Sequence, residues 1–578
     1  MGNSTQSSSP PALRGVPRRR SSFTNERLAA VIRPRAPHSR QTLDPTIAKS
    51  RFRADISAVP FLGQDRPLAT NDGQRVRRSF LIPSIPDLVF SGLAALQVAA
   101  ASLILLNRDG DLPRHIAVGK VMLASHSLVR QDFFSHTAYG QPFLAYEWLS
   151  QLIFAAVYGW AGLDAVAVLT AVFTAWAYAL IAGFLIRRRV AVDLVLVTVI
   201  AAAVVGMADW AARPHAFSFA ASAVLLCLLE PGGRKRLLSF IPLFALWANL
   251  HPGFLFGLGI LGLATVGDLF EAIHGEDRRT WWRAARYHGA ALGLGTVATL
   301  LNPNGIALHL HSLGHLGNAD VIPEIMEFTS PNFHTAEGVV FLGALLLIIA
   351  AIAVGRTRLA MPTLLILLAT VALSLHSRRY IALFGIVTLP LIALALTDDW
   401  QRSVPRVIRG PAEALAQGDR LARRGMFGLA LVGMLGLAVV NDHGSRGRYV
   451  ATEFSPRVFP VDAVNFARKT GVAGNLYNEY MWGGYIALLW PEQRVFIDGF
   501  ADFYGTRIFR DHSQVTTLDG DWRDVLARWK VDLVLVESDS RVAYALAREP
   551  DWDELYRDDV AALFRKRHPA PEQRVNEH

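Results

Sequence analysis

Eleven apolar stretches run through residues 86–442 of this 578-residue chain, and they restrict its fold more than any other feature. Such stretches suit helices that cross a hydrocarbon core ~30 Å thick. Only 18% of the residues are charged, whereas soluble domains carry about 25%. We therefore predict a polytopic α-helical membrane protein with about eleven transmembrane helices, in a domain covering residues 79–443. The predicted spans are 86–106, 164–186, 194–210, 215–230, 237–250, 253–273, 284–301, 337–355, 359–376, 380–397 and 426–442.

The basic residues are unevenly distributed, which decides whether the net charge of +10 indicates a nucleic-acid-binding surface or a basic tail. Residues 1–78 hold 15 of the 58 Lys and Arg residues and are rich in Ser and Pro, so we predict a disordered basic cytoplasmic tail. The charge is therefore not the pattern of a nucleic-acid-binding surface, and we expect no nucleic-acid partner. The single cysteine, Cys227, excludes an intrachain disulfide.

The loop charges predict an orientation. With the tail inside, the inward loops between spans hold 18 Lys and Arg residues and the outward loops hold 7. The positive-inside rule then places the N-terminus in the cytoplasm and residues 444–578 outside. Segment 143–160 is ambiguous, because a span there would move most later basic loops outside. We interpret it as an amphipathic helix in the outer interface.

Under this orientation, polar residues with useful chemistry gather at the outer ends of the helices. Asp109 and Asp111 directly follow the first apolar stretch, and two carboxylates one residue apart can hold a divalent cation or orient a polar substrate. The other outer polar residues are His115, Asp132, Glu147, Arg213, His215, Asn249, His251, Asn302, Asn304, Glu324, Glu327, Arg378 and Arg379.

Some of these residues have a structural interpretation beside the functional one. Arg378 and Arg379 stand between two short apolar stretches, where an Arg fork suits a lipid phosphate, but both side chains can equally extend to lipid headgroups. For His251 and Glu327, the alternative is a helix-end residue hydrogen-bonded to the backbone.

Residues 444–578 are no longer membrane-like and are long enough for one domain. Short β-like runs alternate with helical stretches, which predicts a small extracytoplasmic α/β domain. Asp498, Asp502 and Tyr504 are candidates for an acceptor groove, although Asp498-Gly499 is equally a turn signal. The expected strands are 474–478, 494–499 and 531–537 with a hairpin of 554–557 and 561–566, and the expected helices are 461–470, 522–530 and 540–549.

Residues 109–148 resemble the first outer loop of the GT-C superfamily of integral-membrane glycosyltransferases, which use polyprenyl-phosphate sugars. The acidic DGD sequence follows the first apolar stretch, a short interfacial helix is expected at about 112–125, and P-x-x-x-x-E-W-L begins a second helix at 142–149. The resemblance extends over 86–440, in layout more than in residues. A bacterial branch of the superfamily also shows WANLHPGFLFG, LNPNG, GNLYNEYMWGGY and RVFIDGFADFYG, which occur here at 247–257, 301–305, 474–485 and 494–505.

The resemblance implies a transferase of the bacterial inner membrane that moves a sugar from a polyprenyl-phosphate donor to an envelope glycan, lipid or protein. Asp109 or Asp111 would be the catalytic base or the acid beside a metal ion, although the sequence does not require a divalent cation. The YMWGGY sequence resembles the WWDYG motif of oligosaccharyltransferases but lacks its Asp. The predicted donor-phosphate residues are Arg213, His251, Arg378 and Arg379, and the predicted acceptor or accessory residues are Glu147, Glu327, Tyr480 and Asp498.

Two other function classes remain open from the sequence. The helices of a transporter or flippase would move a lipid-linked sugar, but the polar residues lie at one face and no matching broken-helix repeats are visible. A non-catalytic assembly protein would bind an envelope polymer through its outer domain, but it would not need so many helices as an anchor. No Walker motif, Rossmann fingerprint, nucleophile elbow or zinc-ligand spacing occurs.

Overall fold

A computed structural model of the chain describes Ser79 and residues 82–108, 110–315, 328–403, 405–422, 425–442 and 452–567. All of these residues fall within the compact unit Ser57–His578. The predicted tail at 1–78 lies outside the described residues, and so do Asp109, Glu324 and Glu327.

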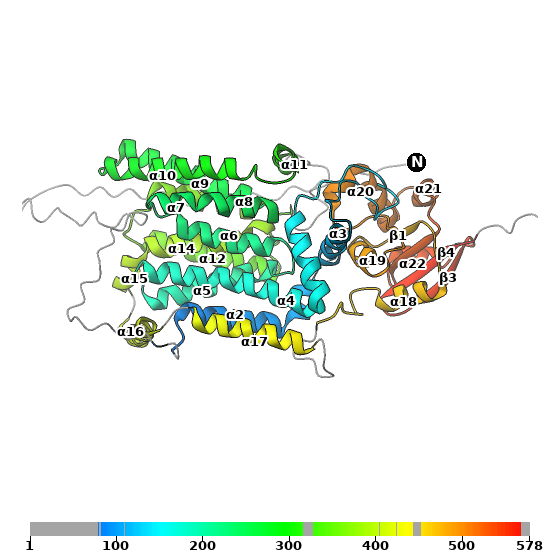
Figure 1. Cartoon of the computed structure of the whole chain (residues 1–578), viewed down its shortest axis with the longest axis horizontal. Helices are drawn as coiled ribbons and strands as arrows, with labels where there is room; N and C mark the ends of the chain where they lie inside the picture. The colour runs from blue at the N-terminus through cyan, green and yellow to red at the C-terminus, as the bar shows by residue number, and fades with distance from the viewer. Residues whose placement is uncertain are drawn as a thin grey trace, which may run out of the picture. The chain divides into compact units, whose positions relative to one another are not determined.

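Each of the eleven predicted apolar stretches is mainly helical (Figure 1). The helices up to residue 442 are α2 Ile85–Ala99, η1 Ser102–Leu106, α3 Asp111–Ser125, α4 Trp148–Arg187, α5 Val192–Gly206, η2 Met207–Asp209, α6 His215–Leu228, α7 Arg234–Leu238, α8 Phe240–Leu250, α9 Phe254–His274, α10 Arg278–Ala298, α11 Ile306–His315, α12 Ala336–Val354, α13 Met361–His376, η5 Arg378–Tyr380, α14 Ile381–Ala395, α15 Thr397–Ser403, α16 Arg406–Leu421 and α17 Met426–Asp442.

By length and composition, some of these helices are able to cross a membrane. In the described part of the chain, five helical segments are long and apolar enough: Trp148–Arg187, Val192–Asp209, Phe254–His274, Ala336–Val354 and Arg378–Ala395. Four shorter apolar helices accompany them: Ile85–Ala99, His215–Leu228, Met361–His376 and Met426–Asn441. The protein is therefore an integral membrane protein, and the number of eleven spans stays a prediction.

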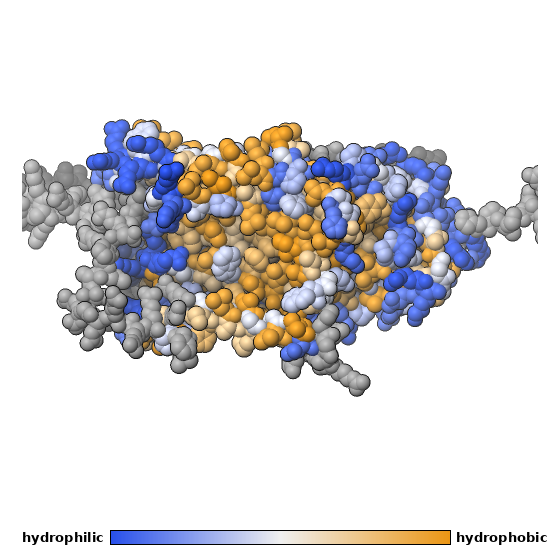
Figure 2. Space-filling model, in the orientation of Figure 1, coloured by the Kyte–Doolittle hydropathy of each residue, from blue (hydrophilic) through white to orange (hydrophobic). Residues whose placement is uncertain are grey.

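The surface of the helices is suited to lipid. Hydrophobic residues cover most of their visible face, whereas hydrophilic residues gather over the C-terminal α/β domain (Figure 2). Leu347 on α12 and Leu429 on α17 are each about 70% exposed, which would be costly in water over so many neighbouring positions. At one edge of the helical region, α9 and α10 lie side by side and are joined by His288 Nδ1 and Asp268 Oδ2, which are 2.5 Å apart and fully buried (Figure 1).

Segment 143–160 is helical only from Trp148, so the second helix begins six residues later than the predicted Pro142. Residues 142–147 form a loop instead, because Phe143 N donates to Arg130 O in a bridge between neighbouring loop segments. Helix α4 breaks at Ala161 and Gly162, where Gly162 has a φ of 68°. The break separates a first part, 148–160, from the predicted span, and the interfacial position of that part stays a prediction.

The C-terminal region contains a small α/β domain, as predicted. Its sheet has the order β1-β2-β4-β3, with β1 and β2 parallel and the other pairs antiparallel. The expected helices form close to their predicted positions, and the predicted hairpin is confirmed. The elements of the α/β domain are α18 Val461–Thr470, β1 Leu476–Asn478, η6 Tyr480–Trp482, α19 Gly483–Leu489, α20 Ala501–Thr517, α21 Trp522–Arg528, β2 Leu533–Glu537, α22 Arg541–Leu546, β3 Trp552–Arg557 and β4 Ala561–Lys566.

The strand predicted at 494–499 is wrong. The segment is extended, but its backbone pairs with the outer loop of the helical region: Val495 N donates to Phe134 O, and His136 N donates to Val495 O. On its other side, the Asn478 side chain bonds to Phe496 N and Ile497 O and so takes the place of a strand. These tertiary contacts occupy backbone N–H and C=O groups that would otherwise pair with a neighbouring strand. Helix α20, which follows, was not predicted.

Candidate active site

Helix α3 begins at Asp111, and a second loop brings an arginine to that point. Arg108 Nη1 donates to the carbonyl oxygens of Met207 and Ala208 at 3.0 and 2.8 Å. Ala212 N donates to Leu105 O at 2.8 Å, which fixes the loop before α6 against the end of the first helix. As a result, Arg213 Nη2 lies 3.2 Å from Asp111 Oδ2. The structure therefore brings together a predicted catalytic acid and a predicted phosphate-binding residue.

Asp111 is also the more accessible of the two acids described at the site. A quarter of its side-chain surface (25%) is exposed, compared with 8% for Glu147. It lies in the first turn of α3, where a helix N-terminus carries partial positive charge. A substrate can therefore reach this carboxyl group.

Two histidines flank Glu147 behind this pair. His115 Nδ1 lies 3.8 Å from Glu147 Oε2, and His251 Nε2 lies 3.6 Å from Glu147 Oε1. Burial lowers the pKa of His115 to about 3, and the positive charges of Arg213 and Arg114 act in the same direction. His115 is therefore neutral at ordinary pH.

A hydrogen-bond chain sets the tautomer of His251, which ends α8. Trp247 Nε1 donates to Ser218 Oγ at 2.7 Å, so the Ser218 hydroxyl is left to donate to His251 Nδ1 at 2.8 Å. Gly253 N also donates to Nδ1, at 3.0 Å. Burial lowers the pKa of His251 well below its usual value, and Arg379 adds to this. His251 is thus neutral, with its proton on Nε2, which faces Glu147.

The structure separates the two neighbouring arginines of η5. Arg378 Nη2 lies 3.2 Å from Glu337 Oε2, and Arg108 contacts the same carboxylate at 3.6 Å. Arg379 instead stacks over Phe328, 4.6 Å from the ring centre, and is close enough to His251 to lower its pKa. Arg378 thus belongs to a cluster with Glu337 and Arg108, whereas Arg379 lies over Phe328.

Arg114 is an important residue that the sequence did not single out. It is fully buried on α3, where its Nε lies 2.6 Å from Asp498 Oδ2 and its Nη2 lies 3.4 Å from Asp132 Oδ1. The guanidinium also stacks over Phe134, 3.8 Å from the ring centre. An Arg one turn after Asp111 and next to His115 was the available signal.

These contacts place the residues predicted for an acceptor groove. Asp498 is fully buried and bound to Arg114, and Tyr504 is buried as well. Tyr480 donates its hydroxyl to Gly499 O at 3.0 Å. The side chain of Asp502 lies outside the described part of the structure. Asp498 thus holds the turn together from inside instead of lining an open groove.

The asparagines of WANLHPGFLFG and LNPNG make local structural contacts. Asn249 Oδ1 accepts from Trp148 Nε1 at 2.8 Å, and Asn249 Nδ2 donates to Leu301 O at 2.8 Å. Asn302 Oδ1 accepts from Asn304 N at 2.8 Å. These bonds connect the start of α4 to the loops after α8 and α10, so they stabilise the edge of the site.

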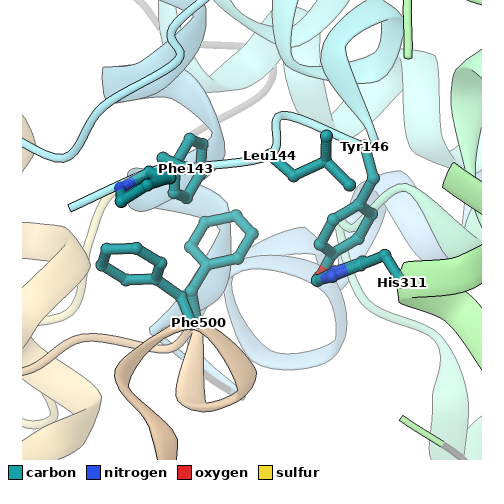
Figure 3. A pocket seen from close by; sticks show the side chains of 7 residues that line it. Phe143, Leu144, Tyr146, His311 and Phe500 are labelled. Atoms are coloured by element: carbon teal, nitrogen blue, oxygen red, sulfur yellow. The ribbon is translucent and has the colours of Figure 1, made fainter. Parts of the chain in front are cut away.

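A cavity of about 230 Å³ opens next to the site. Phe143 and Phe500 approach it from facing segments, and Tyr146 lies beside His311, with ring centres 4.9 Å apart (Figure 3). Phe500 follows Gly499 and Tyr146 precedes Glu147, so the cavity adjoins the charged cluster through both segments. Its lining is Pro142, Phe143, Leu144, Tyr146, His311, Phe500 and Phe503.

Asp109 lies outside the described residues, so a divalent cation at the acidic motif stays a prediction. Arg213 is 3.2 Å from Asp111 Oδ2, so a guanidinium supplies positive charge beside this carboxylate. In the described ranges, no group of three His, Cys, Asp or Glu side chains is arranged to hold a metal ion.

The arrangement of the helices identifies the class of the fold. No protein-family model and no curated protein matches the sequence. The oligosaccharyltransferase AglB from Archaeoglobus fulgidus, in complex with an inhibitory peptide and a dolichol-phosphate, is similar in structure with a TM-score of 0.50 and 12% identity. The match covers 78% of this chain and 69% of that chain. The chain therefore shares the fold of this oligosaccharyltransferase, in agreement with the predicted resemblance.

Two further solved structures are similar at low identity. The apo form of the Archaeoglobus fulgidus oligosaccharyltransferase matches with a TM-score of 0.51 and 13% identity, over 78% of this chain and 69% of that chain. ArnT from Cupriavidus metallidurans, bound to undecaprenyl phosphate, matches with a TM-score of 0.45 and 14% identity, over 82% and 97% of the two chains.

Proposed function

We propose that the protein is a membrane glycosyltransferase that moves a sugar from a polyprenyl-phosphate donor to an acceptor outside the cytoplasm. The observation that carries the proposal is the accessible Asp111 carboxylate beside Arg213, 3.2 Å away, in a chain that shares the fold of an oligosaccharyltransferase. A similar structure contains a dolichol-phosphate, which supports a lipid phosphate as the carrier.

In the proposed reaction, Asp111 accepts the proton of an acceptor hydroxyl while that oxygen attacks the anomeric carbon of the donor sugar. A new bond forms between the acceptor oxygen and this carbon, the bond from the carbon to the phosphate oxygen breaks, and lipid phosphate leaves. Arg213 supplies positive charge beside the Asp111 carboxylate. Arg379, the Nε2–H of His251 and Arg213 stabilise the negative charge of the phosphate. A divalent cation held by Asp109 and Asp111 would supply further positive charge for the leaving phosphate.

We place the acceptor in the cavity lined by Phe143, Phe500 and Phe503. The cavity adjoins Asp111 through residues 499 and 500 and, at about 230 Å³, has room for part of a ligand. Its aromatic lining favours an acceptor with an apolar face, with Tyr146 and His311 as the polar groups. An envelope glycan, lipid or protein with such a face meets this description. Glu147, Tyr480 and Asp498 do not line the cavity, and they would act by positioning the residues that do.

The direct test supplies the purified protein with polyprenyl-phosphate sugars and follows product formation by mass spectrometry. Transfer to an added acceptor, or hydrolysis of the donor, supports the proposal. If donor is moved across proteoliposome membranes with no chemical change, the flippase alternative is correct instead. If the protein retains an envelope polymer and neither moves nor cleaves a donor, the assembly alternative is correct.

The proposal includes a location in a bacterial inner membrane, with the N-terminus in the cytoplasm and the C-terminal domain outside. Reporter fusions at Gly275 and Gly444 are expected to report opposite compartments, because the basic loops lie on the side of Gly275. A fusion within residues 1–78 serves as the control for the cytoplasmic side. The same compartment for Gly275 and Gly444 would show that the predicted spans contain an error, first of all at 143–160.

The arginine pair of η5 offers a matched test of donor binding. Arg379→Lys is expected to raise the KM for the lipid-phosphate sugar about tenfold, because Lys cannot form the forked contact and charge-assisted hydrogen bonds contribute ~1.5–3 kcal/mol. Arg379→Ala should raise it further. Arg378→Lys is the control, since Lys preserves its contact with Glu337. Unchanged kinetics for Arg379→Lys would assign Arg379 to headgroup contact.

A further inference from the structure

Three glycines bring the C-terminal domain into direct contact with the residues around Asp111. A Cβ atom on Gly499 would lie 1.9 Å from Asp111 Oδ1. One on Gly110 would lie 1.9 Å from Met481 O, and one on Gly484 would lie 2.4 Å from Gly110 O. Real Cβ atoms do not approach this closely, so Gly110 and Gly484 are required by neighbouring backbone, whereas a larger residue at 499 would have to displace the Asp111 side chain. The helical region and the α/β domain therefore meet at the predicted catalytic motif itself.

The turn at 498–500 is held firmly in this position. Its Asp498 is bound to Arg114 Nε at 2.6 Å, and Asp498 Oδ1 accepts from Phe500 N at 3.0 Å. Gly499 O accepts from the Tyr480 hydroxyl at 3.0 Å. Arg114 belongs to the same helix as Asp111, one turn further along. The turn and the carboxylate are thus fixed to one rigid element.

Asp111 is consequently held from two sides. Its Oδ2 faces Arg213 at 3.2 Å, and its Oδ1 faces the bare backbone of Gly499. A larger residue at 499 would push the carboxylate away from this orientation and so away from Arg213. A displacement of about 1 Å in a reacting group can cost about 10²-fold in rate.

We infer that Gly499 is a positioning residue for Asp111, and that the C-terminal domain supplies one wall of the catalytic site in addition to any contact with the acceptor. The inference rests on the proposed function for its kinetic consequence. It also predicts that a protein whose C-terminal domain is displaced keeps its donor-binding residues but loses turnover.

The test is a double-mutant cycle with Gly499→Ala, Asp111→Ala and the combined variant in the full-length protein. Gly499→Ala is expected to lower kcat about 10²-fold with little change in the KM for the lipid-phosphate sugar. In the Asp111→Ala background the same change should cause no further loss, because the group it displaces is gone. Gly259→Ala on α9 is the control, since a Cβ atom added there would meet no neighbouring atom within 4 Å.

A second readout is independent of activity. The overlap of the new methyl group with Asp111 Oδ1 should lower the thermal unfolding midpoint of Gly499→Ala, and Asp111→Ala should remove that decrease by opening the space. Wild-type kcat in Gly499→Ala, or equal decreases of kcat and midpoint in both backgrounds, would overturn the inference. If the wild-type protein transfers no sugar, the proposed function fails, and the midpoint cycle still decides whether residue 499 sets the position of Asp111.

Discussion

Asp111→Asn is expected to lower kcat for sugar transfer by about 10²–10⁴-fold, the usual contribution of a general base. Asn has nearly the same size and can still accept a hydrogen bond from Arg213, so the fold should persist while the proton acceptor is lost. The KM for the lipid-phosphate sugar should change little, because Asp111 acts on the acceptor hydroxyl. Initial rates with purified protein and a radiolabelled donor measure both parameters.

Two companion variants make this result specific. Asp539→Asn changes a carboxylate in the C-terminal domain, far along the chain from the site, and should leave kcat unchanged. Asp109→Asn tests the other acid of the motif, which remains an alternative base because it lies outside the described residues. Wild-type rates in both single variants and in the Asp109→Asn, Asp111→Asn double variant would remove the motif from the mechanism.

Arg114→Met is expected to cause the largest loss of stability, because it leaves Asp132 and Asp498 buried without their cation. Removing one partner of a buried ion pair typically costs about 3–5 kcal/mol. The loss should concentrate where the outer loop meets the C-terminal domain, so that domain should become sensitive to limited proteolysis. The thermal unfolding midpoint in detergent and the protease cleavage pattern measure the two effects.

A second arginine of the chain provides the control for this variant. Arg528 Nη1 lies 3.1 Å from Asp511 Oδ1, but 48% of the Arg528 side chain is exposed. Water screens this half-exposed arginine, and Trp529 Nε1 still donates to Asp511 Oδ2 at 2.9 Å, so Arg528→Met should shift the midpoint less than Arg114→Met. Equal midpoints for Arg114→Met and Arg528→Met would show that burial of the Arg114 cluster does not contribute to stability. Arg114→Lys should be intermediate, since it keeps the charge without the planar fork.

The prediction from sequence was most successful where local patterns determine structure. Apolar stretches identified the helices, because backbone groups in a membrane must be satisfied within each helix. The turn signal at Asp558-Asp559 located the β3–β4 hairpin, whose strands pair through neighbouring residues. The DGD sequence after the first apolar stretch identified Asp111 as a candidate, since its position relative to a helix end is visible in one dimension.

Prediction was less successful where distant segments compete for the same backbone groups. Residues 494–499 have the composition of a strand, but they pair with 134–136 and with the Asn478 side chain. Arg114, 18 residues from Asp132 and far from Asp498 in sequence, gave no sign of joining them. Arg378 and Arg379 are equivalent in sequence, and only the packing of η5 directs one to Glu337 and the other over the Phe328 ring.

The sequence by itself determined a membrane-embedded helical chain, an acidic motif at the end of its first helix, and a small α/β domain after its last. These follow from hydropathy, periodicity and turn chemistry, which act over a few residues. Only the tertiary structure decided that the α/β domain meets that motif through Gly499 and Gly484, and that Arg213 faces Asp111. Steric contact and ion pairing act at a few ångströms, and only the folded chain brings residues so far apart in sequence within that range.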